Sequence, residues 1–172
     1  MSRSASARHL LPRHHRAQPA LESVCRRYSV SEIISIGFAG GLASDLCLGD
    51  LVIADTIREV RTITEPTAWG EADLLPVDGL WVEKALKLSF PEALTRRRGG
   101  LVTINQPVCK PSEKMRLGKD YTALAVDMES SVLLRTAIKK EIPFLSVRAI
   151  LDTVEQELID FSNCIDPSGE VS

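Results

Sequence analysis

Histidine is almost absent from this chain of 172 residues, since its three histidines, His9, His14 and His15, all lie within the first 15 positions. Ser-His-Asp and Cys-His nucleophilic sites, the HExxH zinc motif and Cys/His zinc fingers each need an imidazole within the folded region. Beyond position 15 these classes of site are therefore excluded. Acid–base chemistry in the rest of the chain has to come from Asp, Glu, Lys, Cys or Tyr.

Cysteine is also scarce, and its spacing excludes further classes of site. The four cysteines, Cys25, Cys47, Cys109 and Cys164, form no CxxC pair. This spacing argues against a metal centre or a disulfide framework and fits a reducing cytoplasm, where such residues serve as small apolar fillers. We therefore expect a cytoplasmic protein with no bound metal.

Two kinds of partner are excluded in the same way. No run of residues approaches the ~18 apolar residues that a bilayer span needs, so we expect no integral membrane segment. The net charge of −2 provides no overall positive field, so we expect no nucleic-acid partner.

Charge is unevenly distributed along the chain. Residues 1–30 contain six arginines and one acidic residue, Glu22, a net charge of +5, whereas the remainder carries −7. The Arg-, Ser- and His-rich start is typical of an organellar transit peptide, of a disordered leader, or of a start displaced from the natural one. We expect residues 1–19 to form a basic, disordered leader and residues 20–172 to form one domain, because the overall composition is that of a globular protein.

Strand-like and helix-like segments alternate through this domain. Short runs rich in Ile, Val and Leu predict strands at 33–36, 50–55, 101–104, 123–126 and 144–150, with 57–63 continuing the second. Apolar residues at helical spacing predict helices at 20–28, 79–89, 112–117 and 130–140. The alternation indicates an α/β fold around a parallel or mixed sheet.

Ligands of α/β proteins bind where the carboxyl ends of strands meet loops. The first such end carries GFAGG at 37–41, which we expect to leave the strand as a glycine turn. Its backbone N–H groups suit an anion or a sugar hydroxyl, although a tight turn without a ligand explains the glycines as well. A Rossmann dinucleotide site is excluded, because 42–48 is too short for the helix that must follow the glycines.

Carboxylates stand at two further strand ends. Asp127 and Glu129 flank Met128 where a strand gives way to a helix. Either they cap that helix, or they accept the vicinal hydroxyls of a ribose above the apolar Met128. Asp152 follows an apolar strand and suits either a proton donor or the cap of the next turn.

Four motifs occur in a fixed order: GFAGGL at 37–42, GDLVI at 49–53, DMES at 127–130 and PFLSVRAILD at 143–152. Over about residues 30–155 they resemble the purine nucleoside phosphorylase and nucleosidase family. SIGFAGGL, DMES and the tail DPSGEV are most similar to the hopanoid-biosynthesis-associated branch, whose members are thought to release adenine from an adenosylated hopane lipid.

The resemblance implies a three-layer α/β sandwich around a mixed, largely parallel sheet. It implies cleavage of the N-glycosidic bond of a purine nucleoside or an adenosyl conjugate, by phosphorolysis or by hydrolysis. No cofactor is implied beyond inorganic phosphate as a co-substrate of the phosphorolytic route. The resemblance further implies a homo-oligomer that takes a small-molecule nucleoside substrate.

The resemblance also assigns roles to individual residues. The catalytic residues would be Asp152, which protonates the departing purine at N7 or holds that proton, and Glu129, which binds the ribose hydroxyls and stabilises the cationic sugar. The residues that would bind substrate are Met128, Asp127, Val108, Phe38 and Ala39. The residues that would line a site for phosphate or the attacking water are Gly37 and Gly40.

The chain departs from the family pattern at several positions. Phe38 replaces a hydroxyl residue that is common in phosphorylases, and Ser35 stands where some members have a phosphate-binding arginine; both changes weaken phosphate binding. Leu151 replaces a serine near the base. Family members also open with further strands, so the resemblance implies a sheet that is incomplete at its N-terminus. A truncated or inactive member that binds nucleosides or partner proteins is the alternative to an enzyme.

Overall fold

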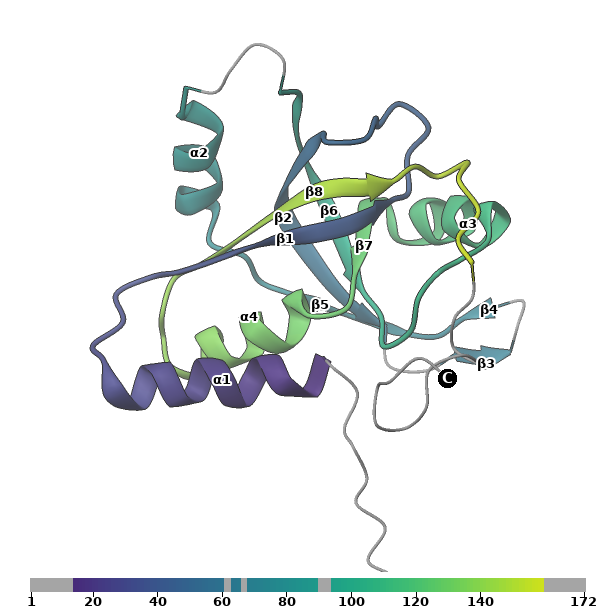
Figure 1. Ribbon diagram of the computed structural model, residues 1–172. Helices are drawn as coiled ribbons and strands as arrows, with labels where there is room; N and C mark the ends of the chain where they lie inside the picture. Colours follow the sequence, from purple (N-terminus) through teal and green to yellow (C-terminus); the bar gives the residue numbers. More distant parts are fainter. Residues whose placement is uncertain (1–13, 61–62, 66–67, 90–93, 160–172) are drawn as a thin grey trace, which may run out of the picture.

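The computed structural model describes residues 14–60, 63–65, 68–89 and 94–159 (Figure 1). The helices are α1 (His14–Arg27), α2 (Gly79–Lys87), α3 (Pro111–Tyr121) and α4 (Ser130–Lys139). The strands are β1 (Ile33–Gly41), β2 (Leu51–Val60), β3 (Ile63–Glu65), β4 (Ala68–Trp69), β5 (Ala72–Leu75), β6 (Arg96–Thr103), β7 (Ala123–Asp127) and β8 (Phe144–Asp152).

One mixed sheet forms the centre of the molecule. Its strand order is β5-β2-β6-β7-β1-β8, and a further pairing of β2 with β8 curls the sheet upon itself. The two longest ladders, β1–β8 and β2–β6, are parallel, and so is β6–β7. The shorter β1–β7, β2–β5 and β2–β8 ladders are antiparallel. The expectation of a mixed, largely parallel sheet is therefore confirmed.

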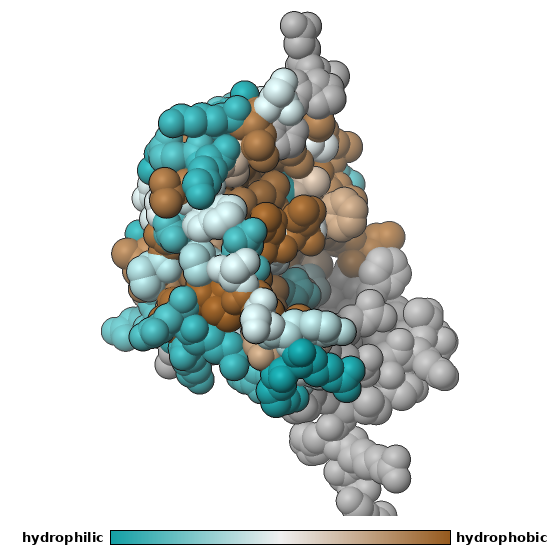
Figure 2. Space-filling view, turned by 90° about the vertical axis from the view of Figure 1, so that its left-hand side faces the viewer, coloured by the Kyte–Doolittle hydropathy of each residue, from teal (hydrophilic) through white to brown (hydrophobic). Residues whose placement is uncertain are grey.

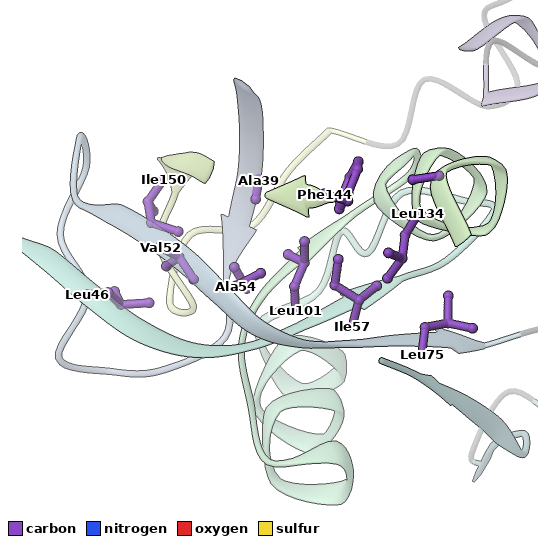
Figure 3. Close-up of a cluster of buried hydrophobic side chains, with 12 residues drawn as sticks. Ala39, Leu46, Val52, Ala54, Ile57, Leu75, Leu101, Leu134, Phe144 and Ile150 are labelled. Carbon is purple, nitrogen blue, oxygen red and sulfur yellow. The ribbon is translucent and has the colours of Figure 1, made fainter. Parts of the chain in front are cut away.

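Helices cover both faces of this sheet. Side chains of a strand alternate between its two faces, and in β2 Val52 and Ala54 join Leu134 of α4 in one core cluster (Figure 3). Ile53, which lies between them in the sequence, instead joins Val82 of α2 in a second cluster. Helices α4 and α2 therefore lie on opposite faces, with α1 packed against α4 (Figure 1). The three-layer α/β sandwich is confirmed.

Helix α1 begins earlier than the sequence pattern indicates. The helix expected at 20–28 is the second part of α1, which starts at His14 inside the segment expected to be a leader. Residues 1–13 of that segment lie outside the described residues, so the division at position 19 stays a prediction. No helix that the structure describes is long and apolar enough to cross a membrane.

Strand β1 differs from the expectation, because it does not turn at Gly37 but runs on to Gly41. It pairs in parallel with β8 from Ile33 to Gly40, and its last two residues also pair with β7. These ladder partners keep the chain extended despite the low strand propensity of glycine, because sheet context outweighs local preference. The glycines thus stand within the sheet, where the missing Cβ leaves room for neighbouring side chains.

One face of β1 is uncovered. Ile34, Ile36 and Phe38 alternate along this face, and Ile36 is 80% exposed. Figure 2 shows hydrophobic surface that is partly bordered by hydrophilic side chains on the side of the molecule that it displays. Rows of exposed apolar side chains are typical of surfaces that another group covers. That the sheet is incomplete at its N-terminus stays a prediction.

Candidate active site

A pocket of about 210 Å³ lies where the ends of β1, β7 and β8 meet. It brings together residues that are more than 100 positions apart in the sequence. Of the residues proposed from the sequence, those that line it are Phe38, Ala39, Gly40, Val108, Asp127, Met128, Glu129 and Asp152. The pocket is completed by Gln106, Pro107, Val126, Leu151 and Leu158.

The two glycines proposed for the phosphate or water site have different surroundings. Gly40 lines the pocket, and a Cβ placed on it would lie 3.1 Å from Oδ2 of Asp152, so the carboxyl group occupies the space that this glycine leaves. Gly37 is not among the lining residues. A Cβ on Gly37 would instead lie 3.6 Å from the guanidinium carbon of Arg148.

Asp127 is buried, and its carboxylate is turned toward protein donors. It accepts hydrogen bonds from Oγ1 of Thr103 at 2.8 Å and from Oγ of Ser130 at 2.6 Å. It also accepts from the backbone N–H of Ser130, the first residue of α4, so it caps this helix. Nε of Arg148 donates a further bond at 2.8 Å. Asp127 thus fits the capping interpretation, and these bonds leave it little capacity to hold a ribose.

Arg148 is the partner that sequence reasoning missed. It lies within β8 and is only 3% exposed, although its side chain is charged. Its Nη1 donates to the carbonyls of Ser35 and Val147, and its Nη2 donates to the hydroxyls of Ser35 and Ser130. Together with the bond to Asp127, all five N–H groups of the guanidinium have acceptors. The signal in the sequence was a charge in the middle of a strand whose other residues before Asp152 are apolar apart from Ser146, because such a charge has to find a buried partner.

Glu129 stands at the N-cap position of α4 but makes no side-chain capping bond. It is half-buried on the pocket wall. Burial raises the pKa of the Glu129 carboxyl above its usual range, the neighbouring Asp127 raises it further, and Arg148 partly offsets both effects. At this helix start, Asp127 is thus the carboxyl that binds protein donors, and Glu129 is the carboxyl on the pocket wall that makes no capping bond.

Asp152 is buried at the end of β8 and forms an ion pair that the sequence analysis did not predict. Nζ of Lys114, in α3, lies 2.5 Å from Oδ2 of Asp152. The Lys114 side chain is completely buried. The amphipathic pattern of α3 contained a weak signal, because Lys114 lies three residues before the buried Leu117 and so on the same face of the helix.

Helix α3 is seated directly on the chain that follows β1. A Cβ on Gly118 would lie 2.7 Å from the carbonyl oxygen of Leu42, a distance that no side chain tolerates. Gly118 follows Lys114 by one helical turn. The absence of a side chain at 118 thus sets how closely Lys114 approaches the pocket.

Metal ligands do not gather at this pocket. Across the described ranges of the chain, no group of three or more His, Cys, Asp or Glu side chains is placed to hold a metal ion. The site offers carboxyls, a buried ammonium and apolar walls.

Comparisons with known proteins show which family the chain is similar to. The family model of the phosphorylase superfamily matches residues 8–166. The 5′-methylthioadenosine/S-adenosylhomocysteine nucleosidase of Aeromonas salmonicida is 29% identical over 167 residues, covering 91% of this chain and 72% of the relative. The nucleosidase of the same name from Listeria welshimeri is 28% identical, covering 76% of this chain and 61% of the relative.

Solved structures share the fold. A Helicobacter pylori nucleosidase mutant with 5′-methylthioadenosine in its active site aligns with a TM-score of 0.71 at 20% identity, covering 83% of this chain and 64% of that one. A futalosine hydrolase mutant of the same species aligns with a TM-score of 0.69 at 19% identity, covering 81% and 65%. The chain thus spans about two thirds of the length of these relatives. On the match to the family model over residues 8–166, the chain belongs to the phosphorylase superfamily.

Proposed function

We propose that this protein cleaves the N-glycosidic bond of a purine nucleoside and releases adenine from an adenosyl conjugate. The observation that carries the proposal is that Asp152 and Glu129 line one pocket together with the apolar side chains of Met128 and Val108. Two carboxyls between apolar walls supply an acid and an anion to the same bound ligand. The nucleosidase names of the relatives support the same activity.

Each carboxyl has a distinct task in this reaction. The bond between C1′ of the ribose and N9 breaks, and its electron pair leaves with the purine. Asp152 gives its proton to N7, so a neutral base departs. Glu129 accepts hydrogen bonds from the ribose hydroxyls, and its negative charge stabilises the cationic sugar. Water adds to C1′ and releases its proton to solvent, from which Asp152 regains its own.

Water, rather than phosphate, is the proposed nucleophile. Arg148 is the arginine against Gly37, and its five N–H groups are all bound to protein acceptors. A saturated guanidinium has no donor left for a phosphate oxygen. The substitutions at Phe38 and Ser35 weaken phosphate binding further.

The finer part of the proposal is a bulky apolar 5′ group on the substrate, such as the hopane lipid that the family resemblance implies. Phe38 and Leu151 line the pocket, yet they are 68% and 61% exposed, so they form an apolar rim. Covering such a rim stabilises a complex by roughly 25 cal/mol per Å² of apolar surface. An adenosyl hopane should therefore show a higher kcat/KM than 5′-methylthioadenosine, and Phe38→Ser should remove this preference. Equal kcat/KM values for the two substrates would contradict this part alone.

The test of the activity is adenine release from both substrates, measured by chromatography with and without phosphate. We expect release that does not depend on phosphate, and Asp152→Asn should lower kcat by about 10³-fold because the acid is lost. Asp50→Asn is the matched control, because Asp50 is also buried but lies outside the pocket, and it should keep its activity. If the wild-type protein releases no adenine under either condition, the proposal is wrong.

A second candidate is a nucleoside-binding or partner-binding protein without catalysis. It is favoured by the uncovered apolar face of β1, with Ile34, Ile36 and Phe38 exposed beside the pocket. Adenine binding in calorimetry without turnover would support it. The homo-oligomer that the resemblance implies also stays a prediction, which sedimentation of the purified chain would test.

A further inference from the structure

A completely buried lysine stands beside the proposed acid. Lysine is almost never fully buried unless its charge is paired, and the Lys114 side chain is 0% exposed. An apolar side chain would pack at this position as well as the stem of Lys114 does. The buried ammonium therefore needs a separate explanation. The explanation lies in what the ammonium binds.

The three N–H groups of Lys114 find three acceptors. They donate to Oδ2 of Asp152 at 2.5 Å, to the carbonyl of Thr153 at 3.0 Å and to the carbonyl of Gln156 at 2.7 Å. An ammonium has three donors and no acceptor, so it is fully satisfied. Asp152 is the one negatively charged group among these three partners.

The same bonds hold the segment 153–158, which follows Asp152. Two of its carbonyls bind Lys114, and the backbone N–H of Leu158 donates to the carbonyl of Cys109 at 3.0 Å. Leu158 in turn lines the pocket. Lys114 therefore fixes both the carboxyl group and the segment beside it that closes one side of the pocket.

We propose that Lys114 is a positioning residue for the general acid: it occupies Oδ2 of Asp152, and so directs the transferable proton to Oδ1. This inference rests on the proposed function. An ammonium can only donate, so Oδ2 has to accept and cannot carry the acidic proton. When Asp152 carries the proton that it gives to N7, that proton therefore has to reside on Oδ1, the oxygen to which Lys114 does not donate.

Lys114 also favours the state that follows proton transfer. When N7 of the purine takes the proton from Oδ1, Asp152 becomes a carboxylate whose side chain is only 8% exposed. An isolated buried carboxylate is strongly disfavoured, whereas one at 2.5 Å from an ammonium is neutralised. Lys114 thus makes the departure of a poor leaving group such as adenine easier without touching the substrate.

The experiment compares two leaving groups. Adenine needs a proton to depart, whereas 4-nitrophenolate leaves a riboside as a stable anion. In Lys114→Met we expect kcat for the adenine substrate to fall about 100-fold with little change in KM, and kcat for the 4-nitrophenyl riboside to fall less than about threefold. Lys114→Arg keeps a cation that only donates, so it should recover part of the activity on the adenine substrate.

Leu117→Ala is the matched control, because Leu117 is also buried on α3 but has no charged group that could pair with Asp152. It should weaken the fold and affect both substrates equally. If Lys114→Met also lowered kcat equally for both substrates, its role would be structural and the inference would be overturned.

Thermal unfolding tests the ion pair without reference to activity. Lys114→Met leaves a buried carboxylate unpaired and should lower Tm by about 10 °C. The double variant Lys114→Met/Asp152→Asn removes both charges and should unfold at a higher temperature than Lys114→Met, even if the single variant folds poorly. A double variant no more stable than the single one would contradict the inference. Absence of adenine release by the wild-type protein would instead overturn the proposed function, with the unfolding result still deciding the ion pair.

Discussion

Two buried ion pairs lie beside the same pocket, and their surroundings differ. Asp127 and Arg148 bind each other and the hydroxyls of Thr103, Ser130 and Ser35, so each polar atom of the arginine has a protein partner. In the pair of Lys114 with Asp152, the ammonium is saturated, but among the residues that the structure describes the carboxyl binds through one oxygen, Oδ2.

The number of free acceptor sites on a carboxyl decides whether it can also bind a ligand. A carboxylate whose acceptor sites are all used can hold strands together but has nothing left for a ligand. A carboxyl that is anchored at one oxygen is fixed in place and still has capacity at the other. Within one cluster of charges, the number of protein partners thus distinguishes the carboxyl that holds the fold together from the carboxyl that we propose as the acid.

The largest effect on stability should come from breaking the saturated pair. Arg148→Met leaves Asp127 buried without its cation, and we expect a loss of about 3–5 kcal/mol in the free energy of unfolding, measured with urea. Arg135→Met is the control, since Arg135 also binds two carboxylates but is one-third exposed, and it should cost about 1 kcal/mol or less. Similar losses for both variants would show that the Arg148 pair does not hold the sheet together.

A smaller effect is expected from Glu129→Gln, which should raise the stability of the fold and lower the activity. The pKa of Glu129 is raised by burial and by Asp127, so the folded state is favoured while Glu129 is protonated. That contribution is present below the ordinary glutamate range and is lost as the pH rises through the raised pKa. Glu129→Gln should therefore unfold at a higher temperature than the wild-type protein at neutral pH, by calorimetry.

The same substitution should lower kcat for adenine release by about 100-fold, because the neutral amide cannot stabilise a cationic sugar. In the wild-type protein, activity should fall as acid protonates Glu129, at a pH above the ordinary glutamate range. A variant that kept full activity would place Glu129 with Asp127 among the structural carboxyls.

The smallest expected effect concerns the outer part of the saturated network. Ser146 is buried, and its hydroxyl lies 2.9 Å from that of Ser130. Ser146→Ala should cost about 1 kcal/mol in the free energy of unfolding and leave kcat unchanged, because Ser130 keeps its bonds to Asp127 and Arg148. A change in kcat would show that this network reaches the chemistry, which would remove the contrast between the two pairs.

Sequence patterns located the carboxyl ends of β7 and β8, because buried strands with acidic ends are local features. They placed Asp152, Glu129 and Met128 around one pocket through the order of the motifs. They failed at β1, where ladder partners from distant strands keep the glycines extended. Gly37 accordingly lies against Arg148 rather than in the pocket wall.

Sequence patterns also missed the partners of the acidic residues. Lys114 and Asp152 are 38 positions apart, and Asp127 and Arg148 are 21 apart. Spacing within a helix or strand predicts which face a charged side chain occupies, but not which side chain of another element it contacts. Only the packing of α3 against β7 and of β8 against β1 brings these charges together.

The contact of Gly118 with the carbonyl of Leu42 has a consequence for how the proposed activity could be altered. A methyl group at 118 would push α3 outward, and Lys114, one turn earlier, would retreat with it. The acid would then weaken although neither it nor any residue in contact with the substrate had changed. Libraries that vary only the pocket wall would miss this route. Selection for activity on substrates with better leaving groups should therefore recover substitutions on the buried face of α3, where Gly118 lies.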